Sequence, residues 1–188
     1  MSRPTAREVA DRALVLYALA RRGAIELVVH EADGDPGRVI QADRAREETD
    51  RWLDRESIGS AVTADERRML DAPSGSWPSQ AVKDALWCKE SMGTLLWALH
   101  HVDTMPGPAT EFQQSVLDEV VMRSGSVDSF RANGTLRSPE EIETAWLEAD
   151  AWFGATEGRD GDDAVIASIG SERFRALSWL RDASAAPA

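Results

Sequence analysis

The sequence predicts an all-α fold: one globular bundle of about seven helices that spans residues 1–182 and has no substantial sheet. Apolar residues, including most of the seven tryptophans, recur at the three- and four-residue spacing of amphipathic helices. Helix-capping patterns open several of these segments. No segment shows the sustained two-residue alternation between hairpin turns that marks a strand. Residues 183–188 are expected to form a disordered tail.

The first predicted helix begins at Thr5 with a T-x-x-E capping box and runs toward Arg22. Its apolar residues cover most of the cylinder, which is typical of a central helix. Gly23 is the candidate break before residues 24–30. After the turn-rich stretch EADGDPG, a second helix is expected over residues 38–56, where dense charge predicts a mostly solvent-facing surface.

Three further segments form the middle of the chain. A capping box at Thr63 opens a short helix that ends before Pro73. The strongest helical pattern covers residues 79–101, with an aliphatic stripe on one side and tryptophans on the other, so this helix is expected to be enclosed. Another helix is expected over residues 111–122, and residues 124–134 are expected to form a loop.

The clearest helix start is the sequence SPEE at Ser138, which combines an N-cap, a proline at the first helical position and a capping glutamate. The apolar stripe of this helix runs from Ile142 to Phe153. A flexible acidic connector is expected over residues 157–163. The last segment, from about Val165 to Leu180, predicts one helix or a pair of helices.

Composition indicates a cytoplasmic protein. The longest apolar run has eight residues, from Ala13 to Ala20, whereas roughly 20 are needed to cross a bilayer. The N-terminus alternates charges and lacks the apolar core of a secretory signal. Cys88 is the single cysteine, so an internal disulfide is excluded. We therefore expect neither membrane insertion nor secretion.

Charge restricts the class of partner. The formal net charge is −12, and residues 103–163 alone contain 14 acidic and four basic side chains. Nucleic-acid binding depends largely on cationic contacts to phosphates, so this acidic excess argues against a nucleic-acid partner. A basic protein is the partner that the acidic region favours.

A catalytic cysteine is not favoured by the spacing. Lys89 could lower the pKa of the neighbouring Cys88 thiol. However, His100 and His101 would lie roughly 18–20 Å along the same helix, beyond hydrogen-bond reach. We interpret Cys88 as a small core residue.

The sequence predicts neither a metal nor another cofactor. Glu26 and His30 share one helical face but do not form the Glu-x-x-His motif of helical di-iron proteins. We expect them to lie on the solvated surface. His100, His101 and Asp103 are adjacent in sequence and would point in different directions on a helix.

Carboxylates recur at seven-residue spacing on the helix that begins at Ser138. The two pairs are Glu141 with Glu148 and Glu143 with Asp150. Paired carboxylates serve glycoside hydrolysis, but these pairs flank the apolar stripe, where solvated residues belong. The sequence also lacks G-x-S-x-G, P-loop and G-x-G-x-x-G motifs.

Polar residues directed inward are the least ordinary feature. Helical geometry places Arg173 within the apolar stripe of the last helix and Arg12 beside the stripe of the first. A buried guanidinium needs a carboxylate or an anionic ligand, and Glu90 and Glu172 are the candidate carboxylates. Glu90 shares a helix face with Trp97. Two interpretations remain open: a buried ion-pair network, or a small polar pocket for an anion or an amphipathic ligand.

Four motifs in fixed order resemble the bacterial domain-of-unknown-function family numbered 4272, over roughly residues 9–182. They are RALVLYALARRGAIE, WCKESMGTLLWALHHVDTMP, LRSPEEIETAWLEADAWF and SERFRALSWLRD. The resemblance implies no established activity, cofactor or catalytic residue. It places the five inward candidates inside the matching motifs: Arg12, Glu90, Trp97, Glu172 and Arg173. The family pattern implies a cation directly before Trp152, where this chain has Ala151.

The functional prediction is a non-enzymatic cytoplasmic binding protein whose acidic residues 103–163 face a basic protein partner, with an immunity- or inhibitor-like role as one form. One alternative is a small hydrolase or transferase with a tryptophan-lined pocket around Glu90 and Arg173. The other is a structural homodimer joined through exposed tryptophans. The sequence leaves monomer and homodimer open.

Overall fold

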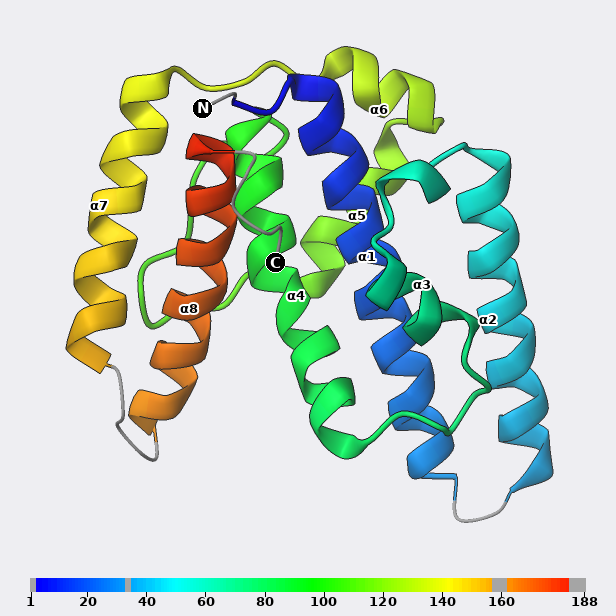
Figure 1. Ribbon diagram of the computed structural model, residues 1–188. Coiled ribbons are helices and arrows are strands. Elements are labelled where there is room, and N and C mark those ends of the chain that lie inside the picture. Colours follow the sequence, from blue (N-terminus) through cyan, green and yellow to red (C-terminus); the bar gives the residue numbers. More distant parts are fainter. Residues whose placement is uncertain (1–2, 33–34, 157–161, 183–188) are drawn as a thin grey trace. The chain divides into compact units, whose positions relative to one another are not determined.

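A computed structural model describes residues 3–32, 35–156 and 162–182. These residues form eight α-helices and one 3-10 helix and contain no strand, which confirms the all-α prediction (Figure 1). The elements are α1 (Ala6–His30), α2 (Pro36–Arg55), η1 (Gly59–Ala61), α3 (Ala64–Asp71), α4 (Ser79–Ala98), α5 (Gln114–Arg123), α6 (Val127–Asn133), α7 (Pro139–Thr156) and α8 (Asp162–Arg181).

The chain divides into two compact units, and helices α1 and α4 contribute residues to both. Unit 1 comprises residues 1–13 and 89–188, and unit 2 comprises residues 14–88. That residues 1–182 form one domain stays a prediction. The expected tail at 183–188 and most of the expected connector, 157–161, lie outside the described residues.

In unit 2, α1 continues through Gly23 without a break. A Cβ atom at Gly23 would lie 2.9 Å from the Cβ atom of Ala85 in α4. The glycine therefore allows the two helix backbones to approach closely and does not interrupt α1. The core of this unit includes Leu53, Ile58 and Leu70, which are fully buried.

A capping side chain begins each of two helices of unit 2: the cap of α3 is the predicted one, whereas the cap of α2 lies ahead of the predicted helix start at residue 38. Thr63 and Glu66 form the predicted capping box of α3, since each side chain accepts a hydrogen bond from the other residue's amide. Helix α2 begins at Pro36 because the Asp35 carboxylate accepts a hydrogen bond from Gly37 N at 2.8 Å.

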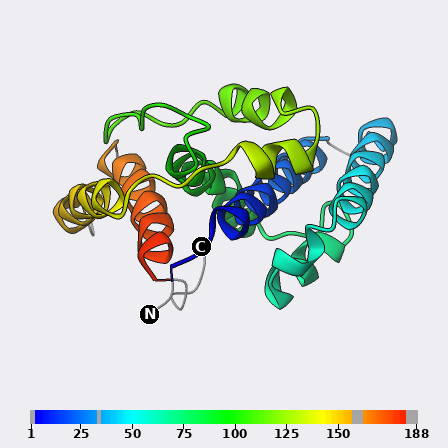
Figure 2. The ribbon, with the colours of Figure 1, turned by 90° about the horizontal axis from the view of Figure 1, so that it is seen from above.

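In unit 1, α7 and α8 pack side by side (Figures 1 and 2). Aromatic rings join them: the Phe174 ring lies 5.5 Å from the rings of both Trp146 and Phe153. The Trp146 indole nitrogen also donates to the Ser178 hydroxyl at 2.9 Å. Helix α8 is continuous, so of the two alternatives for this segment the single helix is correct.

Three boundaries in unit 1 differ from the predicted ones. Helix α4 ends at Ala98 rather than at His101, because His100 adopts a left-handed φ of 59°. Helix α5 begins at Gln114 rather than at Glu111. Residues 127–133 form α6, where a loop was expected.

Helix α6 is short, and its two buried apolar residues, Val127 and Phe130, are too few to produce a periodic pattern. Ser126 caps the helix by accepting a hydrogen bond from Ser129 N at 3.1 Å. The loop prediction failed because tertiary burial of two side chains, rather than sequence periodicity, stabilises this helix.

All seven tryptophans lie within the described residues and are buried or half-buried. The homodimer alternative, which rests on exposed indoles, stays a prediction. Among the helices of residues 3–32, 35–156 and 162–182, none has the length and apolar character needed to span a membrane.

Candidate functional site

Glu90 of α4 and Arg173 of α8 form an ion pair whose side chains have no exposed surface. Arg173 Nε and Nη2 both donate to Glu90 Oε2, at 3.0 and 2.8 Å. The second carboxylate oxygen, Oε1, accepts from the Phe112 amide at 2.8 Å. Phe112 also places its ring 5.0 Å from the guanidinium carbon. The carboxylate and the guanidinium thus close on each other and on Phe112.

The rest of the Arg173 guanidinium binds backbone carbonyls in the loop between α4 and α5. Nη1 donates to Pro106 O at 2.7 Å and to Gly107 O at 3.3 Å, and Nη2 donates to Thr110 O at 2.7 Å. Every guanidinium nitrogen is therefore engaged by protein atoms. The pair fastens this loop between two helices and leaves no donor directed at a ligand.

Burial raises the pKa of Glu90, while the Arg173 guanidinium and the Phe112 amide act in the opposite direction. The carboxylate accepts three N–H groups and donates none, which is the geometry of the ionised form. A catalytic acid or base needs access to its substrate proton. Glu90 has no such access, so the enzyme alternative lacks geometric support at this position.

The other three candidates from the sequence occupy different positions. Glu172 is half-buried and accepts from the Ser91 hydroxyl at 2.7 Å, which joins α8 to α4 beside the Glu90 pair. Arg12 is buried, with 3% exposure, in the part of α1 that belongs to unit 1. Trp97 lies seven residues beyond Glu90, roughly 10 Å along α4, and lines a separate groove.

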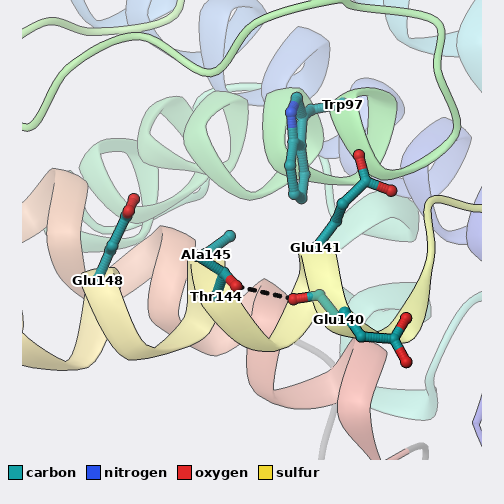
Figure 3. Close-up of a pocket in the computed structure, with 6 residues that line it drawn as sticks. All are labelled: Trp97, Glu140, Glu141, Thr144, Ala145 and Glu148. Atoms are coloured by element: carbon teal, nitrogen blue, oxygen red, sulfur yellow. Dashed lines mark hydrogen bonds between the residues drawn. The ribbon is translucent and has the colours of Figure 1, made fainter.

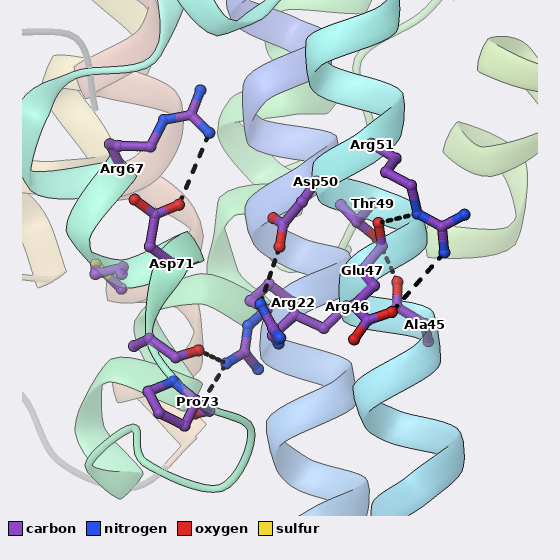
Figure 4. A network of polar contacts seen from close by, with 12 residues as sticks. Arg22, Ala45, Arg46, Glu47, Thr49, Asp50, Arg51, Arg67, Asp71 and Pro73 are labelled. Atoms are coloured by element: carbon purple, nitrogen blue, oxygen red, sulfur yellow. Dashed lines mark hydrogen bonds and ion pairs between the residues drawn. The ribbon is translucent and has the colours of Figure 1, made fainter.

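Unit 2 contains a second buried pair of the same kind, Arg22 with Glu26. Arg22 Nη2 donates to Ala72 O at 2.8 Å and to Pro73 O at 3.2 Å (Figure 4). Its guanidinium carbon lies 5.0 Å from the Trp77 ring centre. As in unit 1, the arginine binds carbonyls of a proline-containing loop and stacks on an aromatic residue at the end of that loop.

Glu26 completes this second arrangement, in which a buried arginine–glutamate pair binds the backbone of a loop. We call each of the two arrangements a clamp. Its Oε1 accepts from Gly75 N at 2.9 Å and its Oε2 accepts from Trp77 N at 3.0 Å. The expectation that Glu26 and His30 lie on the solvated surface is wrong for Glu26, which has no exposed surface. The prediction failed because the loop that buries Glu26 lies about 50 residues away in sequence.

Arg46 and Asp50 form a half-buried ion pair of 3.0 Å on α2 (Figure 4). Burial raises the pKa of Asp50, while Arg46, Arg22 and Arg67 lower it and Asp71 raises it further. The charged residues that act on Asp50 come from three helices of unit 2: Arg22 from α1, Arg46 from α2, and Arg67 and Asp71 from α3.

Unit 1 has an open groove of about 350 Å³ between the end of α4 and the first half of α7. Six residues line it: Trp97, Glu140, Glu141, Thr144, Ala145 and Glu148. Figure 3 shows the Trp97 indole standing over α7, with Glu141 and Glu148 to either side of it. We call this feature the Trp97 groove.

The carboxylates of the Trp97 groove are held differently. Glu141 accepts from Ser138 N at 2.9 Å and from Arg137 Nη1 at 3.0 Å. The Ser138 amide and hydroxyl hold the pKa of Glu141 below its usual range, with Arg137 adding to the effect. Among the described residues, no cation pairs with Glu140 or Glu148, and both are exposed. The groove therefore presents anionic oxygens beside an indole.

The remaining candidates do not assemble into a reactive site. Cys88 is half-buried, and its thiol contacts Asp84 O in its own helix at 3.6 Å. His101 stacks on Phe130 at 4.5 Å, and burial lowers its pKa. The described residues contain no cluster of three metal-ligating side chains.

The pairing of groove residues was not predicted as a site. In the sequence, Glu141 and Glu148 have the pattern of solvated residues beside an apolar stripe, and Trp97 shares a helix face with Glu90. The usable signal was the seven-residue spacing of the two glutamates, because residues i and i+7 share one helix face. The sequence does not show that the end of α4, with Trp97, lies beside that face of α7.

The sequence matches one family, described as a domain of unknown function (DUF4272), over residues 1–186. Neither the curated proteins nor the solved structures include a significant match.

Proposed function

The chain belongs to the DUF4272 family, since the match covers nearly its whole length, and within this family we propose that it is a non-enzymatic binding protein that holds a basic protein partner through the Trp97 groove. This groove combines exposed carboxylates of the acidic region 103–163 with an aromatic wall formed by Trp97. A cytoplasmic location is part of the same proposal.

The observation that carries the proposal is the unpaired state of Glu140 and Glu148 beside Trp97. In the described parts of the chain, these two exposed carboxylates have no cationic partner. A cation placed there would gain the attraction of both carboxylates and of the indole ring. The surrounding charge would add to the attraction at longer range, because residues 103–163 contain 14 acidic and four basic side chains.

A holding role fits the chemistry of the groove better than a reactive one. Glu141 has a lowered pKa because Ser138 and Arg137 stabilise its ionised form. A general acid requires the opposite shift, toward neutral pH. A carboxylate that stays ionised is suited to hold a cation. An immunity- or inhibitor-like protein that covers a basic surface of a toxin or enzyme is one concrete form of this function.

The test compares two charge-matched variants in capture from native lysate at low and moderate salt. Glu140→Gln/Glu148→Gln removes two carboxylate charges from the groove, whereas Glu47→Gln/Glu48→Gln removes the same charge from the exposed surface of α2. We expect a basic protein that binds the wild type and the α2 variant, dissociates at moderate salt, and is lost with the groove variant. A partner retained by the groove variant would contradict the proposal.

A further inference from the structure

Several stacked arginines in this protein share one arrangement. In each of four sets, a guanidinium group lies over an aromatic ring and also contacts a glutamate carboxylate. The four sets are Arg22 with Trp77 and Glu26, Arg137 with Trp97 and Glu141, Arg173 with Phe112 and Glu90, and Arg181 with Trp146 and Glu143.

Two of these sets involve α7, the helix that forms the floor of the Trp97 groove. The Arg181 guanidinium carbon lies 3.8 Å from the Trp146 ring centre, and Arg181 Nε donates to Glu143 at 2.6 Å. The Arg137 guanidinium carbon lies 4.7 Å from the Trp97 ring centre, and the same arginine donates to Glu141 at 3.0 Å. In both sets the guanidinium makes two kinds of contact: its flat face lies on the aromatic ring, and an N–H at its edge donates to the carboxylate.

In the Trp97 groove, Arg137 already lies over the indole and pairs with Glu141, whereas Glu140 and Glu148 have no cationic partner among the described residues. We propose that the groove accepts an arginine side chain of the partner, which lies against the Trp97 indole and pairs with Glu148 or Glu140. This inference rests on the proposed function and specifies the residue type that the groove recognises.

Arginine is favoured over lysine by the shape and hydration of its cation. A guanidinium is planar, so it stacks on an indole while its edge donates two parallel N–H groups to a carboxylate. An ammonium group is compact and strongly hydrated, and it lacks a flat face. The groove offers an aromatic wall and carboxylates within one cavity of about 350 Å³, which matches the two-sided contact that guanidinium makes.

The test uses two peptides that differ only in the cation, acetyl-GRGRG-amide and acetyl-GKGKG-amide, titrated into the whole chain at low salt. Binding is followed by NMR through the Trp97 indole N–H signal, assigned with Trp97→Phe. We expect the affinity of the arginine peptide to be at least about threefold higher than that of the lysine peptide. Glu148→Gln should reduce both affinity and preference, whereas the matched exposed variant Glu48→Gln should change neither.

Each result discriminates between the two proposals. Equal binding of the peptides, lost in Glu148→Gln, would overturn the arginine inference and leave the proposed function standing. Failure of both peptides to bind would overturn both. An arginine preference that persists in Glu148→Gln and in a Glu140→Gln/Glu148→Gln variant would place the binding elsewhere and overturn the inference. Glu140 and Glu148 are exposed, so these variants are expected to fold.

Discussion

Arg173 donates two hydrogen bonds to a single carboxylate oxygen of Glu90, which leaves the other oxygen for the Phe112 amide. Because its two oxygens have different partners, the carboxylate joins α4, α8 and the loop between α4 and α5 at one buried point. A buried ion pair contributes little net stability by comparison with well-packed apolar residues, but loss of one member leaves an uncompensated charge. The clamp is therefore sensitive to single substitutions.

We predict that Arg173→Met lowers the free energy of unfolding by about 3–5 kcal/mol, because it leaves Glu90 buried without its cation. Urea unfolding measures the effect. The control is Arg175→Met on the same helix, since Arg175 is exposed and pairs with the half-buried Glu172, which keeps its hydrogen bond from Ser91. Its expected cost is below about 1 kcal/mol. Similar costs for the two variants would show that the buried clamp has no special role.

The Arg22 and Glu26 clamp in unit 2 predicts slow exchange of two amides. Gly75 N and Trp77 N donate to the two oxygens of Glu26. Glu26→Gln removes the charge and one acceptor oxygen, and a hydrogen bond to a charged group contributes about 1.5–3 kcal/mol. We expect these amides to exchange about ten- to a hundredfold faster, as measured by hydrogen–deuterium exchange. Glu47→Gln, on the exposed side of α2, should leave both rates unchanged.

Local patterns in the sequence predicted most of the fold. The features that they missed depend on contacts between segments far apart in the chain. The capping box at Thr63 is formed entirely by residues 63–66, so the local sequence alone predicts it. Arg22 and Glu26 are four residues apart, but this spacing is typical of exposed helical pairs. Only the distant loop at residues 72–77 makes them a buried clamp.

The same distinction applies to the groove. Glu141 and Glu148 are recognisable as neighbours on one helix face, because they are separated by two turns. Their relation to Trp97 depends on how α4 meets α7, and the residues involved are more than 40 positions apart in the chain. Side-chain periodicity shows which face of a helix is polar but does not show which helix lies against it.

Two helical glycines predict opposite effects of substitution by alanine. A Cβ atom at Gly93 would clash with the Phe112 ring, whereas a Cβ atom at Gly154 would have no neighbour within 4 Å. We expect Gly93→Ala to destabilise the protein by about 1–3 kcal/mol, because the ring that stacks on Arg173 must move. Gly154→Ala should stabilise it by about 0.5–1 kcal/mol. Thermal unfolding of both variants tests the pair, and a stabilising Gly93→Ala would contradict the packing of Phe112.

His101 predicts a loss of stability in mild acid. Burial lowers the pKa of His101 from its ordinary value of 6.5, so the folded protein favours the neutral ring. Between 6.5 and the lower folded value, the unfolded chain binds more protons, and stability therefore falls as the pH falls through that window. Above 6.5 the effect disappears.

His101→Phe keeps an aromatic ring against Phe130 and removes the titration. We expect the stability difference between wild type and His101→Phe, measured by urea unfolding at pH 7.5, 6.5 and 5.5, to shift against the wild type only at the lower values. A difference that is constant across this range would show that His101 is not protonated more easily in the unfolded state.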